Sequence, residues 1–270
     1  MTAEPRRSAV PPEWLDVPSG ALAADAIEAV SSPVFRKRSA MLSGVKPKGV
    51  DRALARLRAR LPQLVYGDAY LEGNTYTEPE VRTLLDGEAV GGKDAADTRQ
   101  VMALSEASAL VARVAHIGPV EPTRELSVRL NELVAGQEAL WVGGLRGEWS
   151  GLPDPEARVT VNVMGDEFRS PRAGDVAALL ETDRAAVAAI AHPVLRGATW
   201  AAFGAYHQYF YDGNKRTARY VMNAVLVSHG YDAILIPAAA KTSYEAALAA
   251  MYRSGDLGPY VDFLIAQYQD

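Results

Sequence analysis

Apolar residues recur at helical spacing along most of this chain. In residues 51–61, Leu54, Leu57 and Leu61 share one side of a helix whose opposite side carries arginines. Residues 94–116 repeat this pattern over a longer stretch. The sequence predicts further helices at residues 21–30, 78–86, 123–134, 173–181, 183–190, 194–209, 214–230, 243–252 and 259–267.

One segment has a different pattern that is typical of strands. Residues 158–163 are rich in β-branched side chains, Gly165 and Asp166 can form a turn, and residues 167–169 can return alongside. We therefore expect an all-α fold with one small β-hairpin. Residues 1–50 are rich in Pro, Ser and Gly, and we expect them to form a partly irregular N-terminal arm.

The composition narrows the range of functions. The chain has 270 residues, and its 28 Lys and Arg against 33 Asp and Glu give a net charge of −5, which argues against partners such as nucleic acid or an anionic membrane. No cysteine is present, which excludes disulfides and thiolate chemistry, and the four histidines lack the spacing of a zinc site. No apolar run could span a bilayer and no signal core is evident, so we expect a cytoplasmic protein.

The residues most suited to binding and catalysis lie at one turn between two predicted helices. Gly213 and Asn214 can begin the second helix, and the free N–H groups at a helix N-terminus attract anions. Lys215 adds a positive charge there, and Arg216 and Arg219 share a side of the helix because they are three residues apart. These features predict a site for a polyphosphate.

Two residues next to this turn could take part in a reaction. Asp212 offers a carboxylate to Mg²⁺, a cation that prefers oxygen ligands. His207, just before the turn, could accept a proton from an attacking hydroxyl. Together with the phosphate site, they predict a centre for nucleotide or phosphoryl transfer.

This segment resembles the signature of the Fic (Fido-domain) family, H-x-F-x-D/E-G-N-G-R-x-x-R. Residues 210–219 match its latter part, except that Lys215 replaces a glycine. The resemblance covers most of residues 60–265 and implies a Fic-type helical bundle in which the hairpin is a flap. Under it, the chain divides into the arm at 1–50, a helical region with an inhibitory segment at 51–117 and a Fic core at 118–270.

The resemblance also implies a function, the transfer of AMP from Mg·ATP to a hydroxyl side chain of a target protein. The hairpin would be the surface to which a segment of that target adds as a strand. A homodimer that controls the inhibitory segment is a further implication. The implied roles are Asp212 for Mg²⁺, Arg216 for the β-phosphate, Arg219 for the γ-phosphate, and Gly213, Asn214 and Lys215 around the phosphates.

The position of the catalytic base has two interpretations. The signature has one residue between its histidine and phenylalanine, whereas Gln208 and Tyr209 lie between His207 and Phe210. If Phe210 fixes the register, Gln208 stands where the base belongs, and a glutamine cannot take a proton near neutral pH. If the loop contains one extra residue, His207 remains the base, and this is the assignment that we adopt.

Lys215 raises a second alternative. Gly-Asn-Lys-Arg resembles the form found in Doc-like relatives, which bind the phosphates in the opposite sense and transfer phosphate. Such proteins usually lack the last arginine, and Arg219 is present here, which favours AMP transfer. The sequence also leaves open a nucleotide-binding module without catalysis and an enzyme that removes AMP from a modified target.

A second match to the family lies upstream. Autoinhibited Fic proteins carry S/T-x-x-x-E-G/N, and residues 68–74 read Asp-Ala-Tyr-Leu-Glu-Gly-Asn. By this resemblance, Glu72 would pair with Arg219 and deny that arginine to the nucleotide, because carboxylate and phosphate compete for one guanidinium. Asp68 replaces the hydroxyl of the pattern, so the anchoring of the inhibitory helix differs here.

Overall fold

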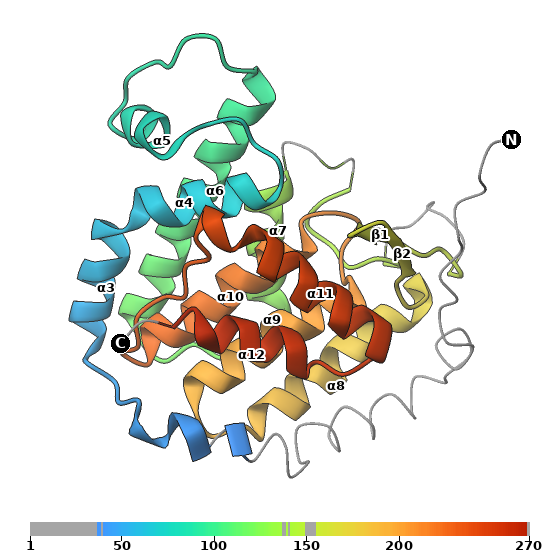
Figure 1. Cartoon of the computed structure of the whole chain (residues 1–270). Coiled ribbons are helices and arrows are strands. Elements are labelled where there is room, and N and C mark those ends of the chain that lie inside the picture. Colours follow the sequence, from blue (N-terminus) through green and yellow to red (C-terminus); the bar gives the residue numbers. More distant parts are fainter. Residues whose placement is uncertain (1–36, 39, 137–138, 140, 149–154, 269–270) are drawn as a thin grey trace, which may run out of the picture.

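Helices dominate the computed structural model, as the sequence predicts (Figure 1). The structure describes residues 37–38, 40–136, 139, 141–148 and 155–268, so the helix expected at 21–30 lies outside the described residues. Within them are ten α-helices and one two-stranded sheet. The elements are α3 (Val50–Ala59), α4 (Leu61–Leu71), α5 (Glu78–Leu85), α6 (Ala95–Ile117), α7 (Arg124–Ala135), β1 (Thr160–Val163), β2 (Asp166–Arg169), α8 (Val176–Ala188), α9 (Pro193–His207), α10 (Asn214–Ser228), α11 (Lys241–Ser254) and α12 (Gly258–Ala266), with short 3-10 turns at Leu42–Gly44, Ala173–Asp175 and Ala238–Ala240.

The helix that carries the phosphate-binding residues, α10, lies at the centre of the bundle (Figure 1). It packs against α9, α6, α7 and α3, and all of its residues except Lys215 are buried. The approach of α9 is close because Gly204 has no side chain, and a Cβ at that position would lie 2.6 Å from the Cβ of Ala218. Helices α8 and α12 cover α9, and α11 packs against α12. The surrounding helices therefore hold the N-terminus of α10 in place.

The N-terminal helices bring the upstream motif to this centre. The helix expected at 51–61 ends at Ala59, and α4 starts at Leu61. Pro62 lies in the first turn of α4, where proline is tolerated because the N–H that it lacks would have no partner within the helix. Helix α4 packs against α6 and α5. Thr77 and Glu80 form a capping box at the start of α5, which projects from the body of the molecule with the first turns of α6 (Figure 1).

The hairpin forms, with Thr160 opposite Arg169 and Val163 opposite Asp166, but its turn is at Met164 and Gly165, so Asp166 belongs to β2 and not to the turn as expected. We call β1 and β2 the flap. The prediction of two helices at 173–181 and 183–190 is wrong, because a 3-10 turn leads into one continuous helix, α8. Thr182 supports that continuity by donating from its hydroxyl to the carbonyl of Ala178 at 3.0 Å. None of the helices in the described part of the chain has the length and apolar content that a membrane crossing requires.

Candidate functional site

The loop between α9 and α10, residues 208–213, has a tightly fixed shape, and we call it the motif loop. The side chain of Asn214 closes it, because its Oδ1 accepts from the backbone N–H of Phe210 at 2.7 Å and its Nδ2 donates to the Phe210 carbonyl at 2.8 Å. Gly213 has φ 71°, and a Cβ there would lie 2.8 Å from the Cβ of Ala135. Glycine is therefore required at this position for both its conformation and its size.

Residues from three separate parts of the chain line one cavity of ≈ 220 Å³ beside the motif loop. They come from the end of α4, from the flap and its approach, and from the motif loop with the first turn of α10. The lining residues are Glu72, Val159, Thr160, Val161, Asn162, Gln208, Tyr211, Asp212, Gly213, Asn214, Lys215 and Arg216. The cavity thus gathers most of the residues that the two sequence motifs single out, although His207 and Arg219 are not among its lining.

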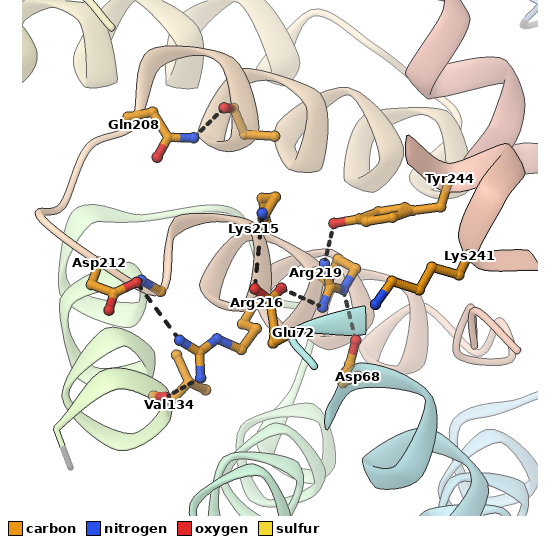
Figure 2. Close-up of polar contacts among 12 residues, drawn as sticks. Asp68, Glu72, Val134, Gln208, Asp212, Lys215, Arg216, Arg219, Lys241 and Tyr244 are labelled. Atoms are coloured by element: carbon orange, nitrogen blue, oxygen red, sulfur yellow. Dashed lines mark hydrogen bonds and ion pairs between the residues drawn. The ribbon is translucent and has the colours of Figure 1, made fainter. Parts of the chain in front are cut away.

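The cavity has the features of an anion site. The first N–H groups of a helix have no partner within that helix, and those of α10 begin at Asn214. Lys215 and Arg216 add two positive charges, and the side chain of Arg216 is only 4% exposed. One amino group of Arg216 donates to the carbonyl of Val134 at 3.2 Å, which holds its guanidinium beside the cavity (Figure 2).

Asp212 lies where its carboxylate and a bound anion could coordinate the same metal ion. Its side chain is 52% exposed and lines the cavity, its Oδ1 accepts from the N–H of Gly213 at 2.5 Å, and the same atom lies 3.7 Å from an amino group of Arg216. Among the described residues, no group of three or more carboxylates or imidazoles could hold a metal alone. A single carboxylate together with phosphate oxygens is a typical Mg²⁺ arrangement, so this donor set fits Mg²⁺ bound with a nucleotide.

Arg219, which does not line the cavity, forms a buried ion pair with Asp68 on α4. The Nε of Arg219 donates to Asp68 Oδ1 at 2.7 Å, its Nη1 donates to the hydroxyl of Tyr244 at 2.8 Å, and its Nη2 lies 3.8 Å from Glu72 Oε1 (Figure 2). The side chains of Arg219 and Asp68 are 2% and 4% exposed. Removal of one partner from a buried ion pair typically costs about 3–5 kcal/mol, because the charge that remains is buried without a partner.

The charges in this cluster shift one another's pKa values. Burial raises the pKa of Asp68, although the guanidinium of Arg219 opposes the shift. Burial alone would lower the pKa of Arg219, but attraction to Asp68 and to Tyr244 raises it well above its usual value. Burial alone would raise the pKa of Glu72, but Lys215 and Arg216 lower it. Glu72 therefore remains a carboxylate at neutral pH and faces the same cations that would bind an anion.

His207 lies in the interior instead of at the cavity. Its Nδ1 is 2.6 Å from Asp183 Oδ2, its ring stacks on Phe203, and its side chain is 7% exposed. The hydroxyl of Tyr209 donates to the same oxygen of Asp183 at 2.5 Å. The structure therefore does not bring the residue that we adopted as the base to the phosphate site, because its imidazole is enclosed by Asp183 and aromatic rings.

Gln208 occupies the cavity side of the motif loop. It has φ 52° and ψ 65°, a left-handed conformation that is uncommon for a residue with a side chain, and it lines the cavity. Its amide nitrogen donates to the carbonyl of Ala205 at 2.5 Å. This placement corresponds to the alternative register of the sequence motif, the one that Phe210 fixes.

Two residues that sequence reasoning missed hold this arrangement. Arg146 is 1% exposed and donates to the carbonyls of Gln208 at 2.5 Å, His207 at 3.1 Å, Pro171 at 3.1 Å and Ala157 at 3.3 Å. Burial lowers the pKa of Arg146 to about 10, so it remains charged at neutral pH. No pattern marks Arg146, because its partners are all backbone atoms.

The position of Asp183 in the sequence could have identified it as a buried residue. On α8 it follows Val176 and Leu180 at helical spacing, so it falls among the apolar positions of the helix and is 0% exposed. A carboxylate at such a position needs a partner inside the fold. Its partners are His207 and Tyr209, which the sequence alone does not reveal.

Comparisons with known proteins agree with the motif and with the architecture. The chain is 27% identical over 207 residues to the protein adenylyltransferase Fic of Drosophila grimshawi and 26% identical to that of Drosophila melanogaster. These matches cover 75% of this chain, which spans only about 40% of the length of the curated relatives. No family model matches the chain.

Solved structures share the fold. A Fic domain containing signaling protein from Bacteroides thetaiotaomicron has a TM-score of 0.64 at 21% identity and covers 90% of this chain and 94% of its own. Fic-1 from C. elegans has a TM-score of 0.62 at 18% identity, with 92% of this chain and 69% of that chain covered. The motif, the helical bundle and both sets of relatives lead to one conclusion: this chain resembles the Fic (Fido-domain) family in sequence and shares the fold of its solved structures.

Proposed function

We propose that this chain is a restrained nucleotide-binding Fic module, which binds a nucleoside phosphate with Mg²⁺ but lacks an imidazole base at the phosphates. The observation that carries this proposal is the placement of Gln208, instead of His207, on the cavity that Lys215 and Arg216 line. A hydroxyl that attacks a phosphorus atom must lose its proton, and a glutamine cannot take that proton near neutral pH.

The binding role follows from the cavity residues. The N–H groups at the start of α10, Lys215 and Arg216 would hold the phosphates. Asp212 would hold Mg²⁺, which neutralises phosphate charge when it is bound. Gly213 and Asn214 keep the motif loop in the shape that presents these groups.

Two carboxylates would restrain the site. Glu72 lies 3.8 Å from both Lys215 and Arg219 and lines the cavity, so it competes with phosphate for positive charge. Asp68 engages Arg219 directly at 2.7 Å. The resemblance suggests Glu72 as the inhibitory residue, and the direct contact of Asp68 with Arg219 supports the same role for Asp68.

The experiment measures Mg·ATP binding by titration calorimetry and label transfer from α-³²P-ATP in parallel. The proposal expects the wild type and His207→Ala to bind Mg·ATP with the same affinity, within about twofold, and neither to transfer label. Transfer that His207→Ala abolishes would contradict it, as would the absence of any nucleotide binding by the folded protein.

Protein adenylyltransferase is the second candidate. It is favoured by the curated relatives, which are named as adenylyltransferases, and by the presence of both arginines of the motif, Arg216 and Arg219. In this case a hydroxyl oxygen of a target protein bonds to the α-phosphorus, pyrophosphate leaves, and His207 must leave Asp183 to take the proton. Label from α-³²P-ATP but not from γ-³²P-ATP would identify this activity, and the opposite result would identify phosphate transfer of the Doc-like kind.

The target-binding role belongs to this second candidate. The flap lines the cavity through Thr160, Val161 and Asn162, so a protein segment that pairs with β1 would pass beside Gln208. A hydroxyl side chain on that segment would be the acceptor. Labelling of proteins in a cell extract, compared between the wild type and a flap variant such as Val161→Pro, tests this role.

A further inference from the structure

The two arginines at the start of α10 have different positions relative to the cavity. Arg216 lines it, whereas Arg219 lies one turn further along the helix and is covered by Asp68, Glu72 and Tyr244. We propose that Asp68 makes this a site for nucleoside diphosphates in preference to triphosphates. The proposal rests on the nucleotide-binding function above and adds which ligand the site accepts.

Two phosphates find donors at the cavity, although Glu72 lies 3.8 Å from one of these donors, the ammonium of Lys215. The N–H groups at the start of α10, the ammonium of Lys215 and the guanidinium of Arg216 all border the same space. Arg216 is held beside that space by a neutral partner, the carbonyl of Val134, at 3.2 Å. The carboxylate near it, Asp212, is half-exposed on the cavity, where a metal ion can join it to the phosphates.

A third phosphate would reach the part of the site where positive charge is already paired. Arg219 is the next cation along the helix, and it donates to Asp68 at 2.7 Å and to Tyr244 at 2.8 Å. To release it, the buried carboxylate of Asp68 would have to lose its partner, which is the costly way to break an ion pair. Glu72 stands between the cavity and Arg219, so the third phosphate would also meet a like charge.

Asp68 has a stronger hold on Arg219 than Glu72 has. The contact with Asp68 is a hydrogen bond at 2.7 Å between side chains that are at most 4% exposed. Glu72 lies 3.8 Å from Arg219, is 18% exposed, and divides its charge between Arg219 and Lys215. Removal of Glu72 alone therefore leaves Arg219 engaged, and only removal of Asp68 makes it available to a phosphate.

A double-mutant cycle tests this assignment. Affinities for Mg·ADP and Mg·ATP are measured by titration calorimetry for the wild type, Asp68→Ser, Glu72→Gly and the double variant. We expect the wild type to bind Mg·ADP more tightly than Mg·ATP, and Glu72→Gly to retain that order. The double variant should bind Mg·ATP about tenfold more tightly than the wild type does, which is the gain expected from one charge-assisted contact.

Two further variants keep the test decisive. Asp68→Asn keeps the shape of the side chain and removes its charge, so it should change the preference in the same direction even if Asp68→Ser does not fold. Asp232→Asn is the matched control, because Asp232 is also buried and paired, at 3.1 Å with Arg56, but lies beyond the far end of α10. It should leave the ratio of the two affinities unchanged.

The outcomes separate this inference from the proposed function. If no folded variant binds either nucleotide, the proposed function itself is wrong. If the wild type binds Mg·ATP more tightly than Mg·ADP, or if Glu72→Gly alone gains as much as the double variant, nucleotide binding stands and the role of Asp68 is overturned.

Discussion

The two ends of the segment 207–219 differ in how their positions are determined. At the C-terminal end, helix α10 presents Lys215 and Arg216 from its first turn, and the predicted start of this helix at residue 214 is enough to place both residues there. At the N-terminal end, His207 and Gln208 are adjacent, and only Gln208 reaches the cavity. A motif therefore specifies geometry well within a helix and poorly where a helix ends.

The physical reason is the direction of successive side chains. Neighbouring residues of a helix point about 100° apart, so a shift of one residue exchanges an interior position for a cavity position. The left-handed backbone of Gln208 separates the directions of the two side chains, and Arg146 holds the carbonyls of His207 and Gln208 in place by hydrogen bonds. We call the N-terminal end, with His207 and Gln208, the base end, and the C-terminal end, with Lys215, Arg216 and Arg219, the phosphate end. The following predictions test the difference between them.

The largest effect is expected at the base end. Gln208→His, made together with Asp68→Ser and Glu72→Gly to release the phosphate end, should raise label transfer from α-³²P-ATP by about 100-fold or more, because a positioned general base contributes about 10²–10⁴-fold. The same background with Gln208 retained is the control. An unchanged rate in a folded variant that binds Mg·ATP would show that residue 208 does not face the reacting phosphate.

The phosphate end can be tested with one substitution made at two positions. Arg216→Lys should weaken Mg·ADP binding about tenfold, because lysine cannot reproduce the paired donors of a guanidinium. Arg219→Lys should change the Mg·ADP affinity by less than about twofold. Residue 219 pairs with Asp68 and not with the nucleotide, and a lysine there keeps the positive charge that this pair needs. Calorimetry measures both, and Arg184→Lys on the surface of α8 is the control. Equal losses at the two positions would remove the distinction between them.

At the base end, the cluster of Asp183, His207 and Tyr209 should stabilise the fold, and its loss should leave Mg·ADP binding unchanged. Asp183→Asn removes a carboxylate that bonds to His207 and Tyr209, and should lower the free energy of unfolding by about 1–3 kcal/mol. Mg·ADP affinity should stay within about twofold. Urea denaturation measures the first quantity, with Glu181→Gln as an exposed control on the same helix. A large loss of affinity with unchanged stability would place the cluster in the binding site.

The smallest effect is a dependence on pH at the phosphate end. Burial raises the pKa of Asp68, so this carboxyl takes a proton earlier than usual as the pH falls, whereas the pKa of Glu72 is lowered and it stays charged. Protonation of Asp68 frees Arg219. Between pH 7.5 and 5.5, the preference of the wild type for Mg·ADP over Mg·ATP should therefore move toward that of Asp68→Asn, by about twofold.

Comparison of the two proteins at each pH cancels the titration of the nucleotide itself. A difference between the wild type and Asp68→Asn that stays constant over this range would indicate that Asp68 remains charged throughout.

The sequence predicted what depends on neighbours along the chain. Most of the helices, the hairpin and the place of Lys215 and Arg216 in the first turn of α10 follow from local periodicity and turn chemistry, whereas no helix was predicted at residues 61–71, where α4 lies. The convergence of Glu72 on the same cavity followed from a family resemblance, because nothing local links two segments so far apart.

Contacts over long distances in the chain could not be predicted. The pair of Asp68 with Arg219 depends on how α4 packs against the bundle, and the enclosure of His207 depends on Asp183 from α8. Helix α8 was predicted as two helices with a break at residue 182, whereas the helix is continuous there and Asp183 is buried. In each case, a polar side chain gains its role from a partner that is distant in sequence.

The most direct test of the account is a crystal structure of the chain with Mg·ADP. We predict phosphate oxygens at the N–H groups of Asn214 and Lys215 and beside Arg216, the Gln208 side chain facing the nucleotide, and Arg219 still bonded to Asp68. A structure in which the His207 imidazole has left Asp183 and faces the α-phosphate would contradict the account.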